Sequence, residues 1–250
     1  MGREQDNQYW NRLYDEVIKE GLCTQCGSCV GLSKGRLQFQ EVRGVLLPIA
    51  LNGNIDSDCY LGCPARYCNY PELNRFVFGG LPENWLLGNY MKSWIGHSCD
   101  DAIRNKAASG GVISSVLIYL LEQKLVDGVI CVKLGVEKPY LAKAVIAKSR
   151  KEVLECSQSV YSVTPVNVIL GELEKVNGRY AYVGLPDQVA SIRKLQLLGN
   201  KAAGKIKYVL GPYTGTQMHF ESIRSFLRSN NVYGENEIAS LQYRAGEWPG

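Results

Sequence analysis

The chain of 250 residues is 46% hydrophobic and 21% charged, a composition that excludes a disordered, collagen-like or coiled-coil protein. Its 28 basic and 24 acidic residues give a formal charge of +4 and are scattered, so the basic stripe typical of nucleic-acid binders is missing. The sequence has neither an apolar run of about 18 residues nor a signal-peptide core. We therefore expect a cytoplasmic protein with no membrane span.

Nine cysteines are the unusual part of the composition, and six of them fall within the first 70 residues. These six are Cys23, Cys26, Cys29, Cys59, Cys63 and Cys68. In a cytoplasmic chain such clustering favours metal or redox chemistry over disulfides. Cys68 and the three later cysteines are expected to be plain thiols, with Cys131 in the core because its surroundings are apolar.

Short elements are predicted for the cysteine-rich part of the chain. The expected elements are a helix over 7–20, a hairpin of strands 36–39 and 44–50, a loop over 59–68, a helix over 71–78 and a turn-rich linker over 79–89. The first 80 residues are accordingly expected to form a small module of their own.

From about residue 90, strands alternate with helices. The expected strands are 91–98, 126–134, 142–147, 179–185, 205–211 and 238–244. The expected helices are 110–124, 149–157, 165–176, 186–198 and 216–230. This alternation predicts an α/β body over residues 90–250, with a mixed, mostly parallel central sheet, flanking helices and function at the carboxyl ends of strands.

The cysteine spacing indicates which metal group to expect. Two-cluster bacterial ferredoxins repeat the run C-x2-C-x2-C-x3-C-P, and each cluster takes its fourth ligand from the other run. Cys23, Cys26 and Cys29 match one run, and Cys63, which precedes a proline, supplies the distant fourth thiolate. A second cluster would need four further cysteines, and only Cys59 stands at one of those positions. The pattern therefore predicts one [4Fe–4S] cluster held by Cys23, Cys26, Cys29 and Cys63, and with it a small ferredoxin-like iron–sulfur module over residues 1–80.

Two alternatives to this ligand set stay open. Cys23, Cys26, Cys59 and Cys63 form two short pairs separated by a loop, which is also the pattern of a zinc ribbon. Cys59 is in addition an alternative to Cys63 as fourth ligand of a cluster. The third cysteine at the correct interval and the Cys63-Pro pair favour iron–sulfur over zinc.

A second candidate site is the turn at Ser109, Gly110 and Gly111, which leads directly into a predicted helix. Free backbone N–H groups at a helix N-terminus attract anions, so the phosphates of a nucleotide cofactor are candidates, with Arg104 and Lys106 close by. The turn lacks both the G-x-G-x-x-G and the P-loop patterns. A glycine pair at such a place is more often a feature of close helix–sheet packing.

A third candidate is the turn after the predicted strand 179–185. Gly184, Leu185 and Pro186 form the turn, while Asp187 and Gln188 fall in the first turn of the next helix. Proline and aspartate at a helix start are ordinary capping features. The turn nevertheless lies at the carboxyl end of a strand, where α/β proteins bind ligands.

Several blocks occur in an order that resembles one family. They are CTQCGSC, a Cys-Pro pair, KAASGGVISSVLIYLLEQKLVDGVI, SRKEVLECSQSVYSVTPVNVIL, GRYAYVGLPDQVASIRKLQ and QYRAGEWPG. The sequence is similar to the coenzyme F420 hydrogenase/dehydrogenase beta-subunit family, which includes the F420-reducing hydrogenase beta subunit and 7-hydroxymethyl chlorophyll a reductase. The resemblance implies an iron–sulfur flavoprotein oxidoreductase that passes electrons between a [4Fe–4S] cluster, FAD and a two-electron acceptor such as coenzyme F420.

The resemblance also implies cofactor residues and partners. In the family the two turns line the flavin, which points to Ser109, Gly110, Gly111, Gly184, Leu185, Pro186 and Gln188, and less directly to Ser159 and Tyr161. A small-molecule or protein electron acceptor or donor is expected as partner. A catalytic partner subunit is a further candidate, because a module with one cluster and a flavin often needs an electron donor.

The sequence departs from the family at three places. Asp187 and Thr214 stand where the family usually has cysteine, and the chain stops at RAGEWPG, where family members normally continue, so we expect a shortened member. These departures keep two alternatives open: a non-catalytic electron-transfer or interaction subunit with a cluster but no flavin, and a zinc-binding α/β protein.

Overall fold

The computed structural model describes residues 8–52 and 54–244. The ends of the two predicted domains, residues 1–7 and 245–250, lie outside the described residues, as does the first residue of the predicted helix 7–20. The helices are α1 (Gln8–Leu13), the π-helix η2 (Tyr14–Ile18), α2 (Ser28–Leu32), α3 (Ser57–Leu61), α4 (Tyr70–Phe78), α5 (Asp101–Lys106), α6 (Val112–Glu122), α7 (Arg150–Glu155), the 3₁₀ helix η3 (Val166–Ile169), α8 (Leu170–Leu173), α9 (Pro186–Leu197), the 3₁₀ helix η4 (Ala203–Lys205), α10 (Phe220–Ser229) and the 3₁₀ helix η5 (Glu235–Glu237). The strands are β1 (Leu37–Val42), β2 (Val45–Ala50), β3 (Gly128–Leu134), β4 (Ala142–Ala147), β5 (Tyr180–Val183) and β6 (Ile206–Leu210).

The central sheet contains four strands in the order β4-β3-β5-β6. β3 and β4 form an antiparallel hairpin, whereas β3 with β5 and β5 with β6 are parallel. Parallel neighbours need a crossover, which is supplied by α7, η3 and α8 before β5 and by α9 before β6. The predicted mixed, mostly parallel α/β sheet is thus confirmed.

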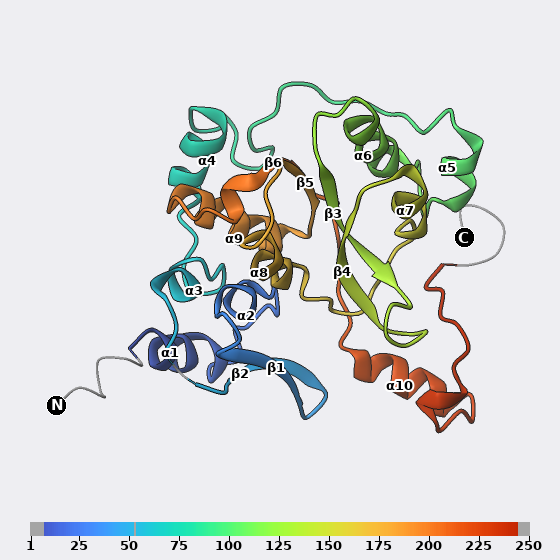
Figure 1. The fold of residues 1–250 in the computed structure, drawn as a ribbon, viewed down its shortest axis with the longest axis horizontal. Coiled ribbons are helices and arrows are strands. Elements are labelled where there is room, and N and C mark those ends of the chain that lie inside the picture. Colours follow the sequence, from blue (N-terminus) through green and yellow to red (C-terminus); the bar gives the residue numbers. More distant parts are fainter. Residues whose placement is uncertain (1–7, 53, 245–250) are drawn as a thin grey trace.

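Helices cover both faces of this sheet (Figure 1). Along β3, successive side chains alternate between the faces, as the period of two in a strand requires. Val129 and Cys131 point into a core formed with α6 and α7, and Ile130 points into a second core formed with α8 and α9. A strand buried on both faces explains why GVICVKL is apolar throughout.

The N-terminal segment shares the second of these cores with the sheet. Leu13, Leu32 and Tyr60, from α1, α2 and α3, belong to one buried cluster with Ile130 and Tyr182 of the sheet. All five side chains are almost completely buried. The cysteine-rich segment therefore packs directly on the face of the sheet that α8 and α9 cover, while its ferredoxin-like character stays a prediction.

The hairpin of β1 and β2 confirms the prediction for this region. The strands pair antiparallel from Leu37 with Ala50 to Val42 with Val45. Arg43 and Gly44 join them with φ angles of 52° and 80°. Two successive left-handed residues are typical of the tight type I′ turn, whose twist matches that of the flanking strands.

Two predicted strands and one predicted loop are wrong, and one helix was not predicted. Residues 91–98 and 238–244 form no strand, because neither segment pairs with a neighbouring strand of the described chain. The helix α3 contains Cys59, where a loop over 59–68 was expected, and α5 precedes the glycine pair without having been predicted. Both helices are short, and such helices depend on tertiary contacts more than on their own propensity.

Candidate metal and cofactor site

The first three cysteines of the predicted ligand set lie in a sharply bent loop and the helix after it. Cys23 and Cys26 belong to the loop, and Cys29 to the first turn of α2. Gln25 and Gly27 adopt left-handed φ angles of 59° and 96°, which bend the backbone between the cysteines. A side chain at Gly27 would place its Cβ 2.8 Å from the backbone nitrogen of Val168, so glycine is needed there for packing as well.

Cys63 joins these three cysteines from a distant part of the sequence. It follows α3, and its side chain lines the same cavity as those of Cys23, Cys26 and Cys29. The cavity measures about 20 Å³, and its remaining walls include apolar side chains of η2 and the β1–β2 hairpin. Cys59 is fully buried in the core and is not among the lining residues.

Burial determines the protonation of the four thiols. It raises the pKa of Cys23 and Cys63, brings the pKa of Cys26 to about 12 and raises that of Cys29 well above its ordinary value. The negative charge of one thiolate also disfavours that of the next, as Cys63 does for Cys26. Without a metal the four groups are therefore neutral thiols at pH 7, and a metal that binds them displaces their protons.

A buried hydrogen-bond network connects the cysteine loop with the sheet. The hydroxyl of Tyr182 donates to Asn167 Oδ1 at 2.5 Å. The Asn167 amide nitrogen donates to Ser28 Oγ at 2.9 Å and to the carbonyl of Gln188 at 3.1 Å. Asn167 is completely buried, and its backbone N–H also donates to the carbonyl of Cys26 at 2.9 Å. One asparagine thus joins β5, the start of α9 and the cysteine loop.

Helix α9 continues this network to the segment that carries Cys63. Ser28 and Ser191 share a hydrogen bond of 2.6 Å, and Ser191 also donates to the carbonyl of Gly62 at 2.8 Å. One turn later, Lys194 Nζ donates to the carbonyl of Cys63, and burial lowers the pKa of this lysine. The sequence did not lead us to predict these positioning residues. A single polar side chain in an apolar stretch such as PVNVIL nevertheless indicates a buried residue that forms hydrogen bonds.

The turn at Gly184, Leu185 and Pro186 lies against the cysteine loop. Asp187, which follows this turn, lies near Thr24 of the loop; burial raises its pKa, and its Oδ2 is buried without a hydrogen-bond partner in the described structure. Gln188 closes the turn itself, because its Oε1 accepts from the Leu185 N–H at 3.0 Å and its amide donates to a backbone carbonyl at 3.0 Å.

Gly184 has a packing reason to be glycine. A Cβ at this position would fall 2.4 Å from the ring of Tyr182, the residue that anchors the network. The turn therefore supports the buried network and touches the cysteine loop.

The turn at Ser109, Gly110 and Gly111 lies elsewhere, in front of α6. Its carbonyls are in use: that of Ser109 accepts from Arg104 at 2.7 Å, and that of Gly110 from the Ser98 N–H at 2.7 Å. Gly111 is left-handed with φ 76°. A Cβ on Gly110 would approach the carbonyl of Gly96 to 3.0 Å, so close packing accounts for this glycine pair.

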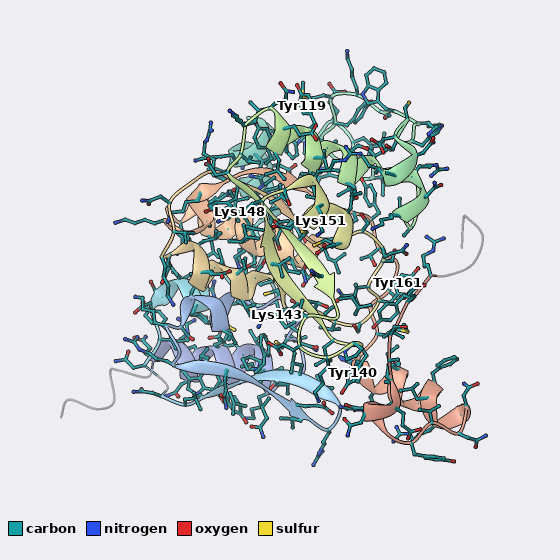
Figure 2. The ribbon with its side chains drawn as sticks, turned by 45° about the vertical axis from the view of Figure 1, so that its right-hand side comes forward. Tyr119, Tyr140, Lys143, Lys148, Lys151 and Tyr161 are labelled. Carbon is teal, nitrogen blue, oxygen red and sulfur yellow. The ribbon has the colours of Figure 1, made fainter. Side chains whose placement is uncertain are left out.

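A second cavity of about 130 Å³ lies at the carboxyl end of β3. Ser159 lines it, and the neighbouring Tyr161 packs edge to face against Tyr243 with ring centroids 5.5 Å apart. Figure 2 shows Tyr161 beside the C-terminal segment. Thr214, in the GPYTG turn after β6, is exposed.

Within residues 8–52 and 54–244, no three His, Cys, Asp or Glu side chains are grouped as the ligands of a single metal ion. None of the helices in the described part of the chain has the length and apolar character needed to cross a membrane.

The sequence is similar to several known proteins. Relatives include the coenzyme F420 hydrogenase subunit beta of Methanosarcina barkeri, 25% identical over 66% of this chain and 58% of the relative. The same subunit of Methanococcus voltae is 36% identical over 50% of this chain and 41% of the relative. The coenzyme F420-dependent sulfite reductase of Methanocaldococcus jannaschii is 24% identical over 87% of this chain and 34% of the relative. The chain thus spans about a third to three fifths of the length of these relatives.

A solved structure has a similar fold, and two family models match the sequence. A chain of the F420-reducing [NiFe] hydrogenase complex from Methanosarcina barkeri superposes with a TM-score of 0.52 and 23% identity, covering 63% of this chain and 57% of that one. Residues 93–171 match the N-terminal model of the coenzyme F420 hydrogenase/dehydrogenase beta subunit, and residues 177–249 match its C-terminal model. With these consecutive matches, which together cover more than half of the sequence, the chain belongs to the coenzyme F420 hydrogenase/dehydrogenase beta-subunit family.

Proposed function

We propose that this protein is an electron-transfer subunit of an oxidoreductase and that Cys23, Cys26, Cys29 and Cys63 hold a [4Fe–4S] cluster. The observation that carries the proposal is that these four thiols, from two separate segments, line one cavity. The names of the relatives, a hydrogenase subunit and a sulfite reductase, support redox chemistry as the class of reaction.

The arrangement of the thiols favours a cluster over zinc. A single zinc ion binds each sulfur at about 2.3 Å, so its four ligands crowd around one point. Here three cysteines at two-residue intervals and a distant fourth, which precedes a proline, line one cavity. A donor set of cysteines alone in this spacing suits a cube of iron and sulfide.

The positions of Cys59 and Cys63 favour Cys63 as fourth ligand. Cys63 lines the cavity, and two hydrogen bonds hold its backbone in place. Ser191 donates to the carbonyl of Gly62, and Lys194 donates to the carbonyl of Cys63. Cys59 packs inside the hydrophobic core instead. Buried donors next to a cluster shield and orient its ligands, which is the role we assign to Lys194 and Ser191.

FAD is the second cofactor of the proposal, and its binding residues would be those of the two turns, Ser109–Gly111 and Gly184–Gln188. A flavin exchanges single electrons with a cluster and electron pairs with an acceptor. Asp187 beside Thr24 puts the second turn next to the cysteine loop, which suits electron transfer between cluster and flavin. Coenzyme F420 or another two-electron acceptor, and a catalytic partner subunit, complete the proposal.

The same turns favour a second candidate, a subunit with a cluster but no flavin. Close packing accounts for Gly110, Gly111 and Gly184, and the side chain of Gln188 is already used by the Leu185 N–H and the Thr164 carbonyl. The 130 Å³ cavity is also smaller than the sites of about 300 Å³ or more that hold cofactor-sized ligands.

Anaerobic purification followed by iron, sulfide, zinc and flavin analysis tests these proposals on one sample. We expect about four irons and four sulfides per chain, with a broad absorption band and no stoichiometric zinc. Iron without flavin would select the second candidate, and zinc without sulfide would contradict the cluster.

Two matched cysteine variants test the ligand set. We expect Cys63→Ser to lose most of the iron and Cys59→Ser to retain it, because Cys59 does not line the cavity. The reverse outcome would make Cys59 the fourth ligand. Circular dichroism of both variants controls for misfolding.

A further inference from the structure

Lys194 is a buried lysine beside the proposed cluster site. It belongs to α9, which packs against α3 and α4, the helices on either side of the segment that carries Cys63 (Figure 1). Only 9% of Lys194 is exposed. Its Nζ donates to the carbonyls of Cys63 and Tyr67, so one amino group bridges two points of this segment.

The positive charge of this lysine has no carboxylate to balance it. In the described part of the chain, Lys194 forms no ion pair with an acidic side chain. Its electrostatic neighbours include the guanidinium group of Arg66 and the thiols of Cys26 and Cys63. A buried charge without a counter-charge is unfavourable, so Lys194 is suited to a site that becomes negative when it is loaded.

The cysteine cavity supplies that negative charge once a cluster is bound. Cys63 shares the cavity with Cys23, Cys26 and Cys29, and binding iron requires the sulfurs as thiolates. Their charge exceeds that of the oxidised iron–sulfide core, so the loaded site is anionic, and reduction adds one more negative charge. None of the other described side chains that line the cavity is an acid or a base. The field of Lys194 is therefore weakly screened there.

We propose that Lys194 raises the reduction potential of the cluster, because its buried positive charge stabilises the reduced form more than the oxidised form. This role rests on the proposed function, of which it is a part. Reduction transfers one electron from a donor to the cluster, while no bond forms or breaks and Lys194 keeps its protons. Net charge and hydrogen bonds near the sulfurs determine cluster potentials. Lys194 is thus a positioning residue, which contacts the backbone of a ligand and supplies no ligand itself.

Variants that remove the charge of Lys194 test its role. Lys194→Met keeps a long side chain without the charge, and Lys194→Gln keeps a hydrogen-bond donor as well. We expect each to lower the equilibrium constant for reduction at least about tenfold, which is about 59 mV for one electron. Lys194→Arg retains the charge, so its constant should stay within about threefold of that of the unmodified protein.

Lys205 offers a matched control away from the cysteines. Its Nζ also donates to two backbone carbonyls, those of Leu173 and Val176, each at 2.6 Å. These carbonyls lie at the C-terminal end of α8 and just beyond it, in a segment without cysteine. Lys205→Met therefore removes the same kind of contact without removing a charge beside a cluster ligand. It should change the equilibrium constant less than about twofold.

The measurement uses the full chain purified anaerobically. Iron and sulfide analysis first establishes how much cluster each variant holds, and circular dichroism shows whether the variant is folded. A redox titration with dithionite and mediator dyes, followed by electron paramagnetic resonance of the reduced cluster, then gives each reduction potential. This readout depends neither on an acceptor nor on enzyme activity.

The outcomes distinguish this role of Lys194 from the proposed function. Absence of a cluster from the unmodified protein would refute the proposed function, and the role of Lys194 with it. A cluster with the same potential in Lys194→Met as in the unmodified protein would overturn the role of Lys194 alone. Shifts of equal size in Lys194→Met and in either Lys194→Arg or Lys205→Met would also overturn it, because charge would not be the cause. Loss of the cluster from both neutral variants would do so too, since Lys194 would then be needed to assemble the site.

Discussion

Asn167 shows how a single buried side chain holds the candidate site together. It is the only polar residue in the run PVNVIL, and it is completely buried. Its amide accepts from Tyr182 and donates to Ser28 and to the carbonyl of Gln188. Leaving a buried amide without such partners costs about 1–3 kcal/mol. The buried polar groups of this network therefore depend on one another for their hydrogen bonds.

Replacing this residue should destabilise the whole protein. We expect Asn167→Ala to lower the free energy of unfolding by about 2–4 kcal/mol, because it leaves the buried Tyr182 hydroxyl without its acceptor and removes one of the hydrogen bonds of Ser28. Urea unfolding followed by circular dichroism measures the change. Asn230→Ala is the matched control, since Asn230 is exposed at the end of α10, and its loss should stay within about 0.5 kcal/mol. Equal effects of the two changes would show that the network does not stabilise the fold.

Glu235 links protonation to the docking of α10. Tyr140 OH and Arg224 Nε donate to its two carboxylate oxygens, each at 2.6 Å, and these bonds lower the pKa of Glu235. A depressed pKa in the folded state stabilises the protein above the unfolded pKa, about 4.3, and this contribution is lost as the pH falls through the folded value.

Because the pKa of Glu235 is lowered in the folded protein, the stability lost on removing its charge should depend on pH. Glu235→Gln should cost about 1 kcal/mol of unfolding free energy at pH 7 and progressively less below about pH 4, where the native carboxylate also becomes protonated. Urea unfolding at pH 7 and at pH 3.5 tests it, with exposed Glu83→Gln as control. A loss of equal size at both pH values would contradict the electrostatic explanation.

At the level of elements, two glycines allow α2 and α8 to pack with their backbones in contact. A Cβ on Gly31 would lie 2.6 Å from the carbonyl oxygen of Asn167, and one on Gly171 would lie 2.6 Å from the carbonyl oxygen of Gly31. Backbone atoms cannot yield as a flexible side chain does, so both positions exclude any larger residue. This close approach holds the helix that carries Cys29 against the segment that carries Asn167.

An alanine at Gly31 should therefore destabilise the protein, although alanine favours helix formation by about 1 kcal/mol over glycine. We expect Gly31→Ala to cost about 2–4 kcal/mol through steric overlap. The matched control is Gly204→Ala in η4, where nothing lies within 4 Å of an added Cβ, and there the change should be neutral or slightly stabilising. Thermal unfolding of both variants measures the difference in stability. A Gly31→Ala variant as stable as the unmodified protein would show that α2 can move away from the Asn167 segment without cost.

At the level of the whole molecule, the cysteine-rich segment and the sheet are stabilised by a common core. Leu13, Val17 and Tyr60 belong to the same buried cluster as Ile130 and Tyr182, and Figure 1 shows α2 beside α8. Removing one part would expose a large apolar face of the other. The predicted boundary between residues 80 and 90 separates the two parts in sequence while they fold on one hydrophobic core.

We expect the two parts to unfold together. In a variant that keeps Trp10 as its only tryptophan, fluorescence reports on the first helix, while far-ultraviolet circular dichroism reports on all helices and strands. The two urea transitions should coincide, as they do for a two-state protein. A fluorescence transition at clearly lower urea would show that the N-terminal segment unfolds independently.

The sequence by itself determined the main elements of the body and the candidate thiols. Period-two and helical apolar patterns are local properties, so β3, β4, α6 and α9 were predicted close to their observed bounds. The predicted strands 91–98 and 238–244 have suitable local patterns and yet find no strand to pair with. The spacing of the cysteines in turn indicated a metal site without its geometry.

Only the tertiary structure decided which of these groups meet. It brings Cys63 to the cavity of the first three cysteines and leaves Cys59 in the core. The physical reason is that these contacts join residues far apart in sequence, where no local periodicity reports on distance. They depend on buried polar groups such as Asn167 finding partners and on glycines that let backbones touch, and both conditions exist only in the packed protein.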